Sequence, residues 1–526
     1  MRDLVSPPFP PARPGRLPLE RSGANCSRIG RETTCLEERN LLLAARGLAA
    51  DATLGLRSQG RCDGWVTHPR RCTLAGFAAA PGRGLWRDHA MTARQTVAHL
   101  ACVCSLFAAP VLAQDLDARI DREVERASAA MVEIRHRLHQ NPELSNRETE
   151  TAALVADQLR QLGLEVKTGV AKTGVIAILR GGKPGPRIAV RADIDALPVT
   201  EETGFPFQST KRDTFLGQEV GVAHACGHDV HTSALLGVAT VLTALRAEIP
   251  GSIQFIFQPA EEGPPPGERG GAELMLEEGA FAEKPVAVFA LHAFPDLPVG
   301  QVGFNPGATM AAVDQFTARI KGKQAHGAYP HLSIDPVVMA AQAILALQTI
   351  RSRTLPAFEP SVVTVGIVRG GERFNIIPSE VHLEGTVRTY GAEAQSTVER
   401  RMREILDGTT RAGGGSYELD YKKNAPATIN DPALAATVRP LLERTLGADN
   451  VKIVEPSMAG EDFAYFANQV PGFFFRLGVV RPGTESGGLH TPTFRADDSA
   501  VPMGMRVMAR LLVDYLTLSN QTHSPR

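Results

Sequence analysis

Residues 223–234 hold the densest group of chemically active side chains in this sequence. Cys226, His228, Asp229 and His231 stand a few residues apart around one glycine. Thiolate and imidazole ligands at such spacing suit a transition metal. Cys226 is also the only cysteine after position 104, so packing, reactivity or metal binding has to explain it. A lone buried cysteine is the ordinary alternative.

Two carboxylates follow an apolar run further along the chain. Residues 253–257 have the composition of a strand buried on both faces, Pro259 ends the run, and Glu261 and Glu262 follow. Neighbouring side chains that leave a strand diverge, so one carboxylate can bind a metal while the other acts as general base toward a water. A solvated acidic turn is the common alternative for such a pair.

Two histidines stand at comparable places. His292 comes directly after the apolar residues 286–291 and before Pro295, while His490 lies between a glycine pair and Pro492, which indicates a loop. A single histidine of this kind is more often structural than metal-binding. Several of them at expected strand ends and in loops, beside a lone cysteine, favour a metal site.

Ten short motifs in a fixed order resemble one amidohydrolase family. They are LHQNPEL, RADIDALP, HACGHD, QPAEE, LHAFP, AHGAYPH, NIIP, GTVR, GEDF and LHTP. The family includes hippurate hydrolases, N-acyl-amino-acid deacylases and indole-acetyl-amino-acid hydrolases, and it is related to aminoacylase and glutamate carboxypeptidase. The resemblance covers about residues 120–516. It implies a metal-dependent enzyme that cleaves the amide bond of N-acyl or N-aroyl amino acids, or of short peptides.

The resemblance also implies roles for individual residues. Two divalent ions (Zn, Mn, Co or Ni) would be held by five side chains, namely Cys226, His228, Glu262, His292 and His490. Cys226 would bridge the ions, Glu261 would be the general base and Asp195 would orient the site. Five ligands shared by two ions leave positions for a water and a substrate carbonyl, as metal-assisted amide hydrolysis requires.

Two readings from other classes remain open at this point. Cys226 with His228 or His231 would make a thiol hydrolase, which a thiol-alkylating reagent inactivates and a chelator does not. A catalytically inactive metal-binding scaffold is the second, although an intact Glu261 argues against it. The proline-rich residues 263–270 depart from the family pattern beside the expected metals, so they could reshape the pocket for the acyl group.

After Met310 the pattern changes to that of a small α+β layer in the order βαββαβ. We expect strands at 314–320, 362–368, 381–389 and 417–421, and helices at 336–349 and 392–406. In the family this insert is a lid and dimerisation domain, which implies a homodimer or higher homo-oligomer. By resemblance its polar residues are His326, as oxyanion donor, Asn375, and Arg388, as partner of the substrate carboxylate. Each could instead be a surface or strand residue.

Around this insert at 309–425, we expect a bipartite catalytic domain at 114–308 and 426–526. Apolar runs at 175–179, 187–191, 253–257 and 472–477 alternate with helical patterns at 120–139, 148–162, 232–247 and 432–446. This alternation predicts an α/β fold, with a mixed sheet covered by helices on both faces and ligands collected at strand ends.

The first 113 residues differ in composition from the rest of the chain. They hold six of the seven cysteines and both tryptophans. Residues 1–90 lack sustained periodicity and are interpreted as an extension that is not normally translated. Residues 91–113 have an arginine, an apolar stretch and a small-residue cleavage pattern, which predict a signal peptide and a periplasmic or secreted enzyme. An uncleaved anchor or a disordered tail is the alternative.

Charge and hydropathy exclude two classes of partner. Residues 1–90 carry 14 Arg against 8 Asp and Glu, while the whole chain has a formal net charge of -1, so the remaining chain is acidic. An acidic surface makes nucleic acid an unsuitable partner. No segment after residue 113 is long and apolar enough to span a membrane, and we expect a small-molecule substrate.

Overall fold

The computed structural model describes residues 93–523, with side chains from 116 to 521. The expected extension at 1–90 lies outside these residues. Of the predicted signal peptide at 91–113, only the backbone from residue 93 is described, as the beginning of helix α1 (Ala93–Gln140). Export therefore stays a prediction. Among the described residues, no helix combines the length and apolar character needed to cross a bilayer.

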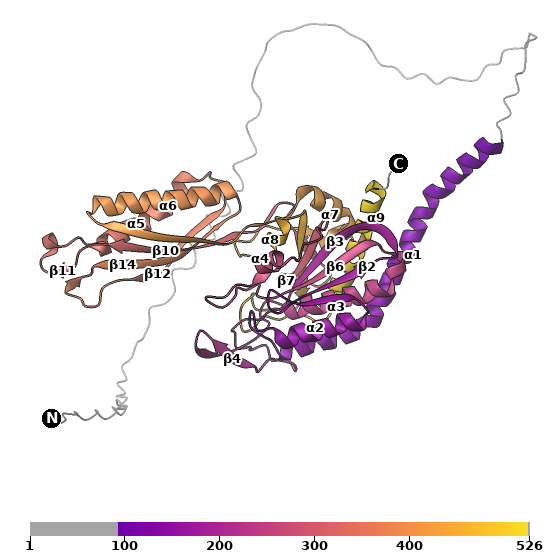
Figure 1. The fold of residues 1–526 in the computed structure, drawn as a ribbon, viewed down its shortest axis with the longest axis horizontal. Coiled ribbons are helices and arrows are strands. Elements are labelled where there is room, and N and C mark those ends of the chain that lie inside the picture. Colours follow the sequence, from indigo (N-terminus) through magenta and orange to yellow (C-terminus); the bar gives the residue numbers. More distant parts are fainter. Residues whose placement is uncertain (1–92, 524–526) are drawn as a thin grey trace, which may run out of the picture. The chain divides into compact units, whose positions relative to one another are not determined.

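A mixed sheet of eight strands forms the centre of the larger part of the chain (Figure 1). Its spatial order is β1 (Glu165–Val170), β2 (Gly174–Arg180), β6 (Pro250–Gln258), β3 (Lys183–Asp193), β7 (Val288–Pro298), β18 (Gly472–Val480), β8 (Val302–Phe304) and β17 (Val451–Ile453). The four central strands β6, β3, β7 and β18 run parallel to one another, and the strands on either side of this group are antiparallel to it. The carboxyl ends of the four central strands therefore meet at one edge, where ligands collect in open α/β sheets.

Both faces of this sheet are buried. Phe473 and Phe475 face one core, while Phe474 between them faces the other, because successive side chains on a strand alternate. The first core packs against α1, α2 (Thr149–Gln161), α3 (His228–Ala244), α7 (Pro432–Leu446) and α9 (Ala500–His523). The second packs against α4 (Gly271–Glu277) and α8 (Ala464–Ala467). The predicted α/β class with helices on both faces is confirmed.

Two of these elements differ from the sequence-based expectation. Helix α3 begins at His228 rather than near residue 232, so the metal-ligand motif forms its first turn. Strand β7 continues to Pro298, so His292 lies within a strand rather than after its end. The reason is tertiary pairing, because β18 runs parallel to β7 on both sides of His292 and keeps that backbone extended.

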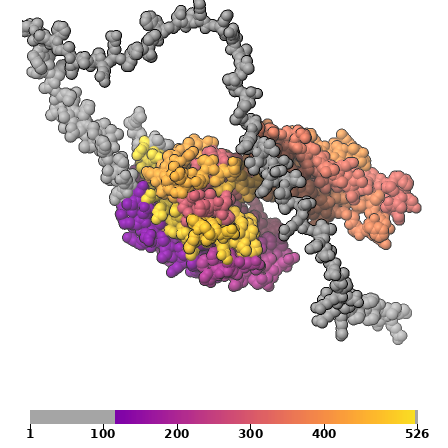
Figure 2. Space-filling model, turned by 180° about the vertical axis from the view of Figure 1, so that it is seen from behind, coloured from indigo at the N-terminus to yellow at the C-terminus, as the bar shows by residue number. Residues whose placement is uncertain are grey.

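The first and last long helices of the described chain pack together at the surface (Figure 2). Arg506 and Arg510 of α9 contact the carboxylate of Asp121 in α1. Because α3 also packs against both helices, α1, α3 and α9 form one layer beneath the sheet. This layer supports the first turn of α3, where the candidate ligands begin.

A second, four-stranded antiparallel sheet carries the residues between the two segments of the larger part. Its order is β12 (Ser361–Arg369), β14 (Glu380–Thr389), β10 (Ala312–Lys321) and β15 (Ser416–Ala425). The buried residues of β10 alternate along the strand and pack beneath α5 (Pro336–Thr349) and α6 (Ala392–Ala412). The chain order β10, α5, β12, β14, α6, β15 is the predicted βαββαβ arrangement.

Short elements complete the described chain. At one end of the small sheet, β11 (Ala325–His326) pairs with β13 (Ile376–Ile377) (Figure 1). Where the chain enters and leaves this part, β9 (Ala308–Met310) pairs with β16 (Thr428–Ile429). A hairpin of β4 (Arg212–Phe215) and β5 (Gln218–Gly221) stands apart from both large sheets. Single helical turns lie at Arg246–Glu248, Pro330–Leu332 and Ala448–Asn450, and a π-helical turn at Ile350–Thr354.

Candidate metal centre

The five expected metal ligands come together at one edge of the large sheet. Ligand atoms of Cys226, His228 and Glu262 lie within 4.8 Å of one another. The Sγ atom of Cys226 lies 3.5 Å from Nε2 of His292, and Nε2 of His490 lies 3.1 Å from Oε1 of Glu262. All except the buried His228 line one cavity of about 730 Å³. Segments far apart in the sequence therefore build one donor set.

The surroundings of His228 show whether these side chains fit a metal ion. Its Nδ1 lies 2.9 Å from the backbone oxygen of Asp195, which assigns the hydrogen to that nitrogen. Its Nε2 is buried and has no hydrogen-bond partner among the described residues. Carboxylate oxygens of Asp193, Glu261 and Glu262 lie 3.7–3.9 Å from this nitrogen. Burial opposes protonation, but Asp193 and Asp195 raise the pKa of His228 to about 10, so the surroundings favour a cation here, either a proton or a metal ion. The thiol, imidazole and carboxylate donors around it suit zinc or a similar transition metal.

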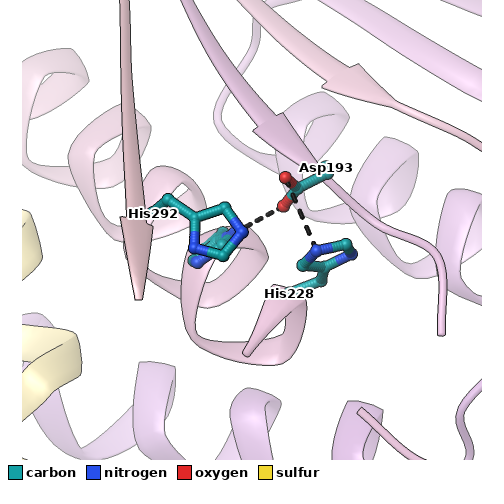
Figure 3. Close-up of side chains that lie close together, drawn as sticks. Asp193, His228 and His292 are labelled. Carbon is teal, nitrogen blue, oxygen red and sulfur yellow. Dashed lines mark hydrogen bonds and ion pairs between the residues drawn. The ribbon is translucent and has the colours of Figure 1, made fainter. Parts of the chain in front are cut away.

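A second group of side chains that could hold a metal overlaps with the first, and two of its members already bond each other. Asp193, His228 and His292 point toward a common region (Figure 3), and His231 joins them. However, Nδ1 of His231 lies 2.5 Å from Asp193, and its Nε2 accepts a hydrogen bond from the backbone N–H of Ala293. Both ring nitrogens are therefore occupied. His231 therefore supports the site through Asp193 and Ala293 and has no ring nitrogen left for a metal ion.

Asp195 acts on two of the expected ligands. Its Oδ1 lies 3.3 Å from Nδ1 of His228, and its Oδ2 accepts hydrogen bonds from Ser145 Oγ and from the backbone N–H of Glu262. Burial opposes ionisation, but the hydrogen bonds from His228 and Ser145 outweigh it and lower the pKa of Asp195. This geometry agrees with the predicted role of a carboxylate that orients the ligands.

The thiol of Cys226 is unsuited to act as a nucleophile by itself. Burial, together with the charges of Glu262 and Glu261, raises its pKa well above the usual range. His292 donates from Nδ1 to a backbone oxygen, so its Nε2 faces the sulfur without a proton to share. A thiol in these surroundings ionises when a cation binds beside it, as a metal ligand does.

Gly227 separates two of the ligands and is required by the backbone. Its φ is +86°, and a Cβ added there would lie 2.7 Å from the Cβ of Ala293. Its carbonyl accepts the first hydrogen bonds of α3, from the N–H groups of Val230 and His231. A glycine here lets the chain turn into the helix while Cys226 and His228 both reach the cavity.

Two non-glycine residues of the site also adopt left-handed backbone. Ala260, directly before Glu261, has φ +52°, and His490 has φ +63°. Each such conformation costs about 1 kcal/mol or more and persists where the surroundings hold it. The N–H of His490 donates to the carbonyl of Ala225, which ties the loop of His490 to the segment that carries Cys226.

Glu261 lies among further carboxylates that the sequence analysis did not assign. Carboxylate oxygens of Glu261, Glu461 and Asp462 lie within 4.8 Å of one another. Burial, followed by the charges of Glu461 and Glu262, raises the pKa of Glu261 well above its usual range. A carboxylate held this way has a high proton affinity, which suits a general base.

Arg191 compensates these charges from within strand β3. Its guanidinium donates to Asp193 at 2.8 Å, to Glu461 at 2.9 Å and to Asp462 at 3.1 Å. The RADIDALP and GEDF motifs are thus joined by one buried cation. The sequence contained a signal for this buried network: charged residues such as arginine and aspartate inside an apolar strand require oppositely charged partners.

His139 of the LHQNPEL motif supports the other side of the site. Its Nδ1 lies 3.0 Å from Asp229, and its Nε2 lies 3.0 Å from Glu201. Arg135 also donates to Asp229, at 2.9 Å. Because both ring nitrogens face carboxylates, the imidazole carries two protons. Asp229 is thereby held beside the ligand His228.

The structure brings only one of the three expected lid residues to the cavity. Arg388 lines it, and its Nη1 donates to Thr386 Oγ1 and the carbonyl of Val387. No carboxylate of the described residues forms an ion pair with its guanidinium. His326 and Asn375 lie instead on or beside β11 and β13 and do not line this cavity. Arg388 and the β11–β13 pair lie at opposite ends of strand β14, and eight residues of strand span about 26 Å.

Comparison with known proteins agrees with this arrangement. Residues 189–514 match the model described as Peptidase family M20/M25/M40. N-acetyl-L-cysteine deacetylase of Bacillus subtilis is 39% identical over 373 residues, which are 70% of this chain and 84% of the relative. IAA-amino acid hydrolase ILR1-like 2 of Arabidopsis thaliana is 35% identical over 73% of this chain and 85% of its own length.

A solved structure shows the same fold. The Bacillus subtilis YXEP protein, described as a dinuclear metal-binding peptidase from the M20 family, is 36% identical to this chain. The superposition has a TM-score of 0.63 and covers 75% of this chain and 99% of that protein. The similarity therefore includes both parts of the fold described above.

The pair of His139 and Asp229 makes stability depend on pH. Burial opposes protonation, but Asp229 and Glu201 outweigh it and raise the pKa of His139 from 6.5 to about 9. A raised pKa means that the contribution is complete below the unfolded value and disappears as pH rises through about 9. We expect His139→Gln to lower the unfolding free energy by about 2–3 kcal/mol at pH 6 and far less at pH 10. Denaturant unfolding at both pH values measures this, with His331→Gln as the exposed control.

The predicted ligand role of Cys226 gives a second test. We expect Cys226→Ser to lower metal content and activity together, because a hydroxyl replaces the ionisable sulfur while the fold is kept. Metal analysis of the purified variant and its hydrolysis rate are compared with those of the wild type. Normal metal stoichiometry in the variant would remove Cys226 from the ligand set, whatever the rate.

Proposed function

Because this chain belongs to Peptidase family M20/M25/M40, a family of metal-dependent amide hydrolases and peptidases, we propose that it cleaves N-acyl or N-aroyl amino acids. The observation that carries the proposal is the composition of one cavity. It contains a thiol, imidazoles and a carboxylate fit for metal, a high-pKa carboxylate, and an arginine without a carboxylate partner. Short peptides with a free carboxyl terminus also carry an amide bond for the metal centre and a carboxylate for the arginine, so they are possible substrates too.

The division of roles proposed here is the one that the family resemblance implies, and the clustering of these residues supports it. Cys226, His228, Glu262, His292 and His490 would hold two divalent ions. Such ions acidify a water and polarise a carbonyl oxygen. Glu261 accepts the proton of the attacking water at its carboxylate and passes it to the nitrogen of the leaving amine. The charges of Glu461 and Asp462 raise the proton affinity of Glu261, and the charge of Arg191 lowers it.

The amino-acid half of the substrate is assigned to the side of Arg388. A planar guanidinium matches a carboxylate in a two-pronged hydrogen bond. Arg388 is half-buried, and burial lowers its pKa. An anionic partner would offset this effect by stabilising the charged guanidinium. His326 stays the predicted oxyanion donor and Asn375 its predicted neighbour, but one chain by itself does not place either at the cavity.

The alternative of a thiol hydrolase is not favoured by the described residues. It would require a cysteine that ionises near neutral pH beside a histidine that takes its proton. Cys226 has the opposite shift, and its nearest imidazole, His292, has a pKa lowered by burial and by His231. Metal binding uses His292 as the neutral imidazole that its lowered pKa favours, and a bound cation would itself ionise the thiol of Cys226.

A hydrolysis panel tests the proposal directly. We expect the purified enzyme to release free amino acid from several N-acyl and N-aroyl amino acids, to lose this activity with a chelator, and to regain it with a divalent metal. Thiol alkylation of the metal-loaded enzyme serves as the control for the thiol mechanism. Activity that survives the chelator but not alkylation would establish the thiol hydrolase instead.

Substitutions of the adjacent glutamates separate base from ligand. Glu261→Gln should keep the metal and lower kcat by about 10²- to 10⁴-fold, because only the proton acceptor is removed. Glu262→Gln should lose metal as well as activity, because a charged ligand is removed. Metal content and kcat are measured on both proteins. The reverse pattern would exchange the two roles.

The role of Arg388 is tested on the substrate as well as on the enzyme. Converting the substrate carboxylate into an amide should lower kcat/KM strongly in the wild type, because the guanidinium loses its partner. The same change should matter far less in Arg388→Ala, since that variant lacks the partner already. Steady-state kcat/KM values of both enzymes on both substrates are compared in a double-mutant-type cycle, in which the substrate change replaces the second mutation. Equal discrimination would place carboxylate recognition elsewhere.

A further inference from the structure

A second cavity, of about 460 Å³, adjoins the metal-site cavity. The two share the walls Glu262 and Gly263, and residues 264–270 continue from this junction. Its apolar lining includes Leu144, Leu197, Phe215, Leu216, Pro265 and Pro266. Its volume lies within the usual range for a small-molecule site. A ligand whose reactive carbonyl sits at the metal centre therefore has a second place into which one of its ends can extend.

Two polar groups that line this cavity are already engaged, while Glu262 belongs to the metal site and Thr214 is uncharged. Ser145 donates to Asp195 at 2.7 Å. Arg147 forms an ion pair with both carboxylate oxygens of Glu268, at 2.6 and 3.2 Å. Neither group is free to bind a charged ligand, so the surface that remains available is mainly hydrocarbon. A group with its own charge would lose hydration here without gaining a partner.

Leu216 gives an independent sign that a ligand contacts this surface. It occupies the turn between β4 and β5 with φ +51°, followed by Gly217 with φ +76°. A two-residue turn with two positive φ values favours Asn-Gly, so a leucine is conformationally disfavoured there. Its side chain is also 67% exposed. Neither the turn nor the protein core explains a large aliphatic residue at this position.

The wall formed by the proline-rich segment is fixed in place. Glu268, near its end, accepts hydrogen bonds from Asn146 and Arg147 and contacts Lys172. Arg269 forms ion pairs with Glu273 and Glu277 of α4. The consecutive prolines limit the remaining backbone freedom. The cavity is thus preformed, which lowers the entropic cost of binding.

We propose that this second cavity binds the acyl half of the substrate and selects an uncharged hydrocarbon acyl chain longer than acetyl. The proposal rests on the function proposed above, in which Arg388 holds the amino-acid half in the first cavity. The scissile carbonyl would lie near Glu262, where the two cavities meet. The protein would therefore be a deacylase for amino acids that carry a lipophilic acyl group.

An acyl-length series tests this with the full-length, metal-loaded enzyme. The substrates are acetyl, butanoyl, hexanoyl and succinyl derivatives of the amino acid that works best as its N-acetyl form. Since each buried methylene contributes up to about fourfold, we expect kcat/KM to rise at least about tenfold from acetyl to hexanoyl. The succinyl derivative, which carries a charge, should be the poorest of the four.

Two variants and one control locate the effect. Thr214→Trp, which places a bulky ring in the cavity lining, should lower the hexanoyl-to-acetyl ratio about tenfold. Leu216→Asn, which suits the turn, should lower it about threefold by removing apolar contact. Gln218→Trp is exposed in the same hairpin but outside the lining, and should keep the wild-type ratio.

The outcomes distinguish this inference from the proposed function. Hydrolysis of the acetyl member with an unchanged ratio in both cavity variants would overturn the acyl site and leave the proposed function standing. A wild-type preference for the succinyl member would also overturn it, because it requires a free cation in the cavity. Absence of hydrolysis of every member would refute the proposed function and the acyl site together.

Discussion

The candidate metal centre depends on the compensation of negative charge in a buried space. Carboxylates from four segments converge there, and like charges a few ångströms apart repel strongly once water is removed. Arg191 offsets part of this repulsion through Asp193, Glu461 and Asp462. Even so, burial and Glu461 raise the pKa of Asp462 to about 7 despite the attraction of Arg191. A bound metal cation would neutralise the remaining negative charge, so the electrostatics and the donor set both favour a metal ion.

This requirement explains why the supporting residues are distributed along the whole fold. Arg191 and Asp193 enter from the end of β3, and Glu461 from the segment before α8. On the other side, Arg135 and His139 of α1 hold Asp229 in the first turn of α3. The carboxylates beside the ligands are therefore held by cations from other elements, and His228 and Glu262 are held by Asp195. Rigid placement of ligands by such outer contacts is what tunes metal sites in proteins.

Much of this arrangement could be predicted from the sequence, and the misses have physical causes. Buried strands and amphipathic helices follow from local periodicity, and the ligands follow from residue types at strand ends. The start of α3 at His228 was missed because Gly227 makes a helix begin where a loop was expected. The position of His292 inside β7 depends on pairing with β18, about 180 residues later, which no local pattern reveals. The sequence also leaves open that His326 lies away from Arg388 within one chain, because motif order says nothing about which end of a strand a residue occupies.

The length of strand β14 determines how far the far end of the small sheet moves when that sheet rotates. The chain passes into the small sheet through one pair of short strands, β9 and β16, and Arg388 lies near the end of β14 that lines the cavity. β11 and β13 lie at the opposite end of the small sheet. If the small sheet turns as a rigid body about its connection, it acts as a lever, and a rotation of about 10° displaces a point roughly 26 Å out by about 4–5 Å. Under such a rotation His326 would move by several ångströms, whereas Arg388, near the connection, would move little.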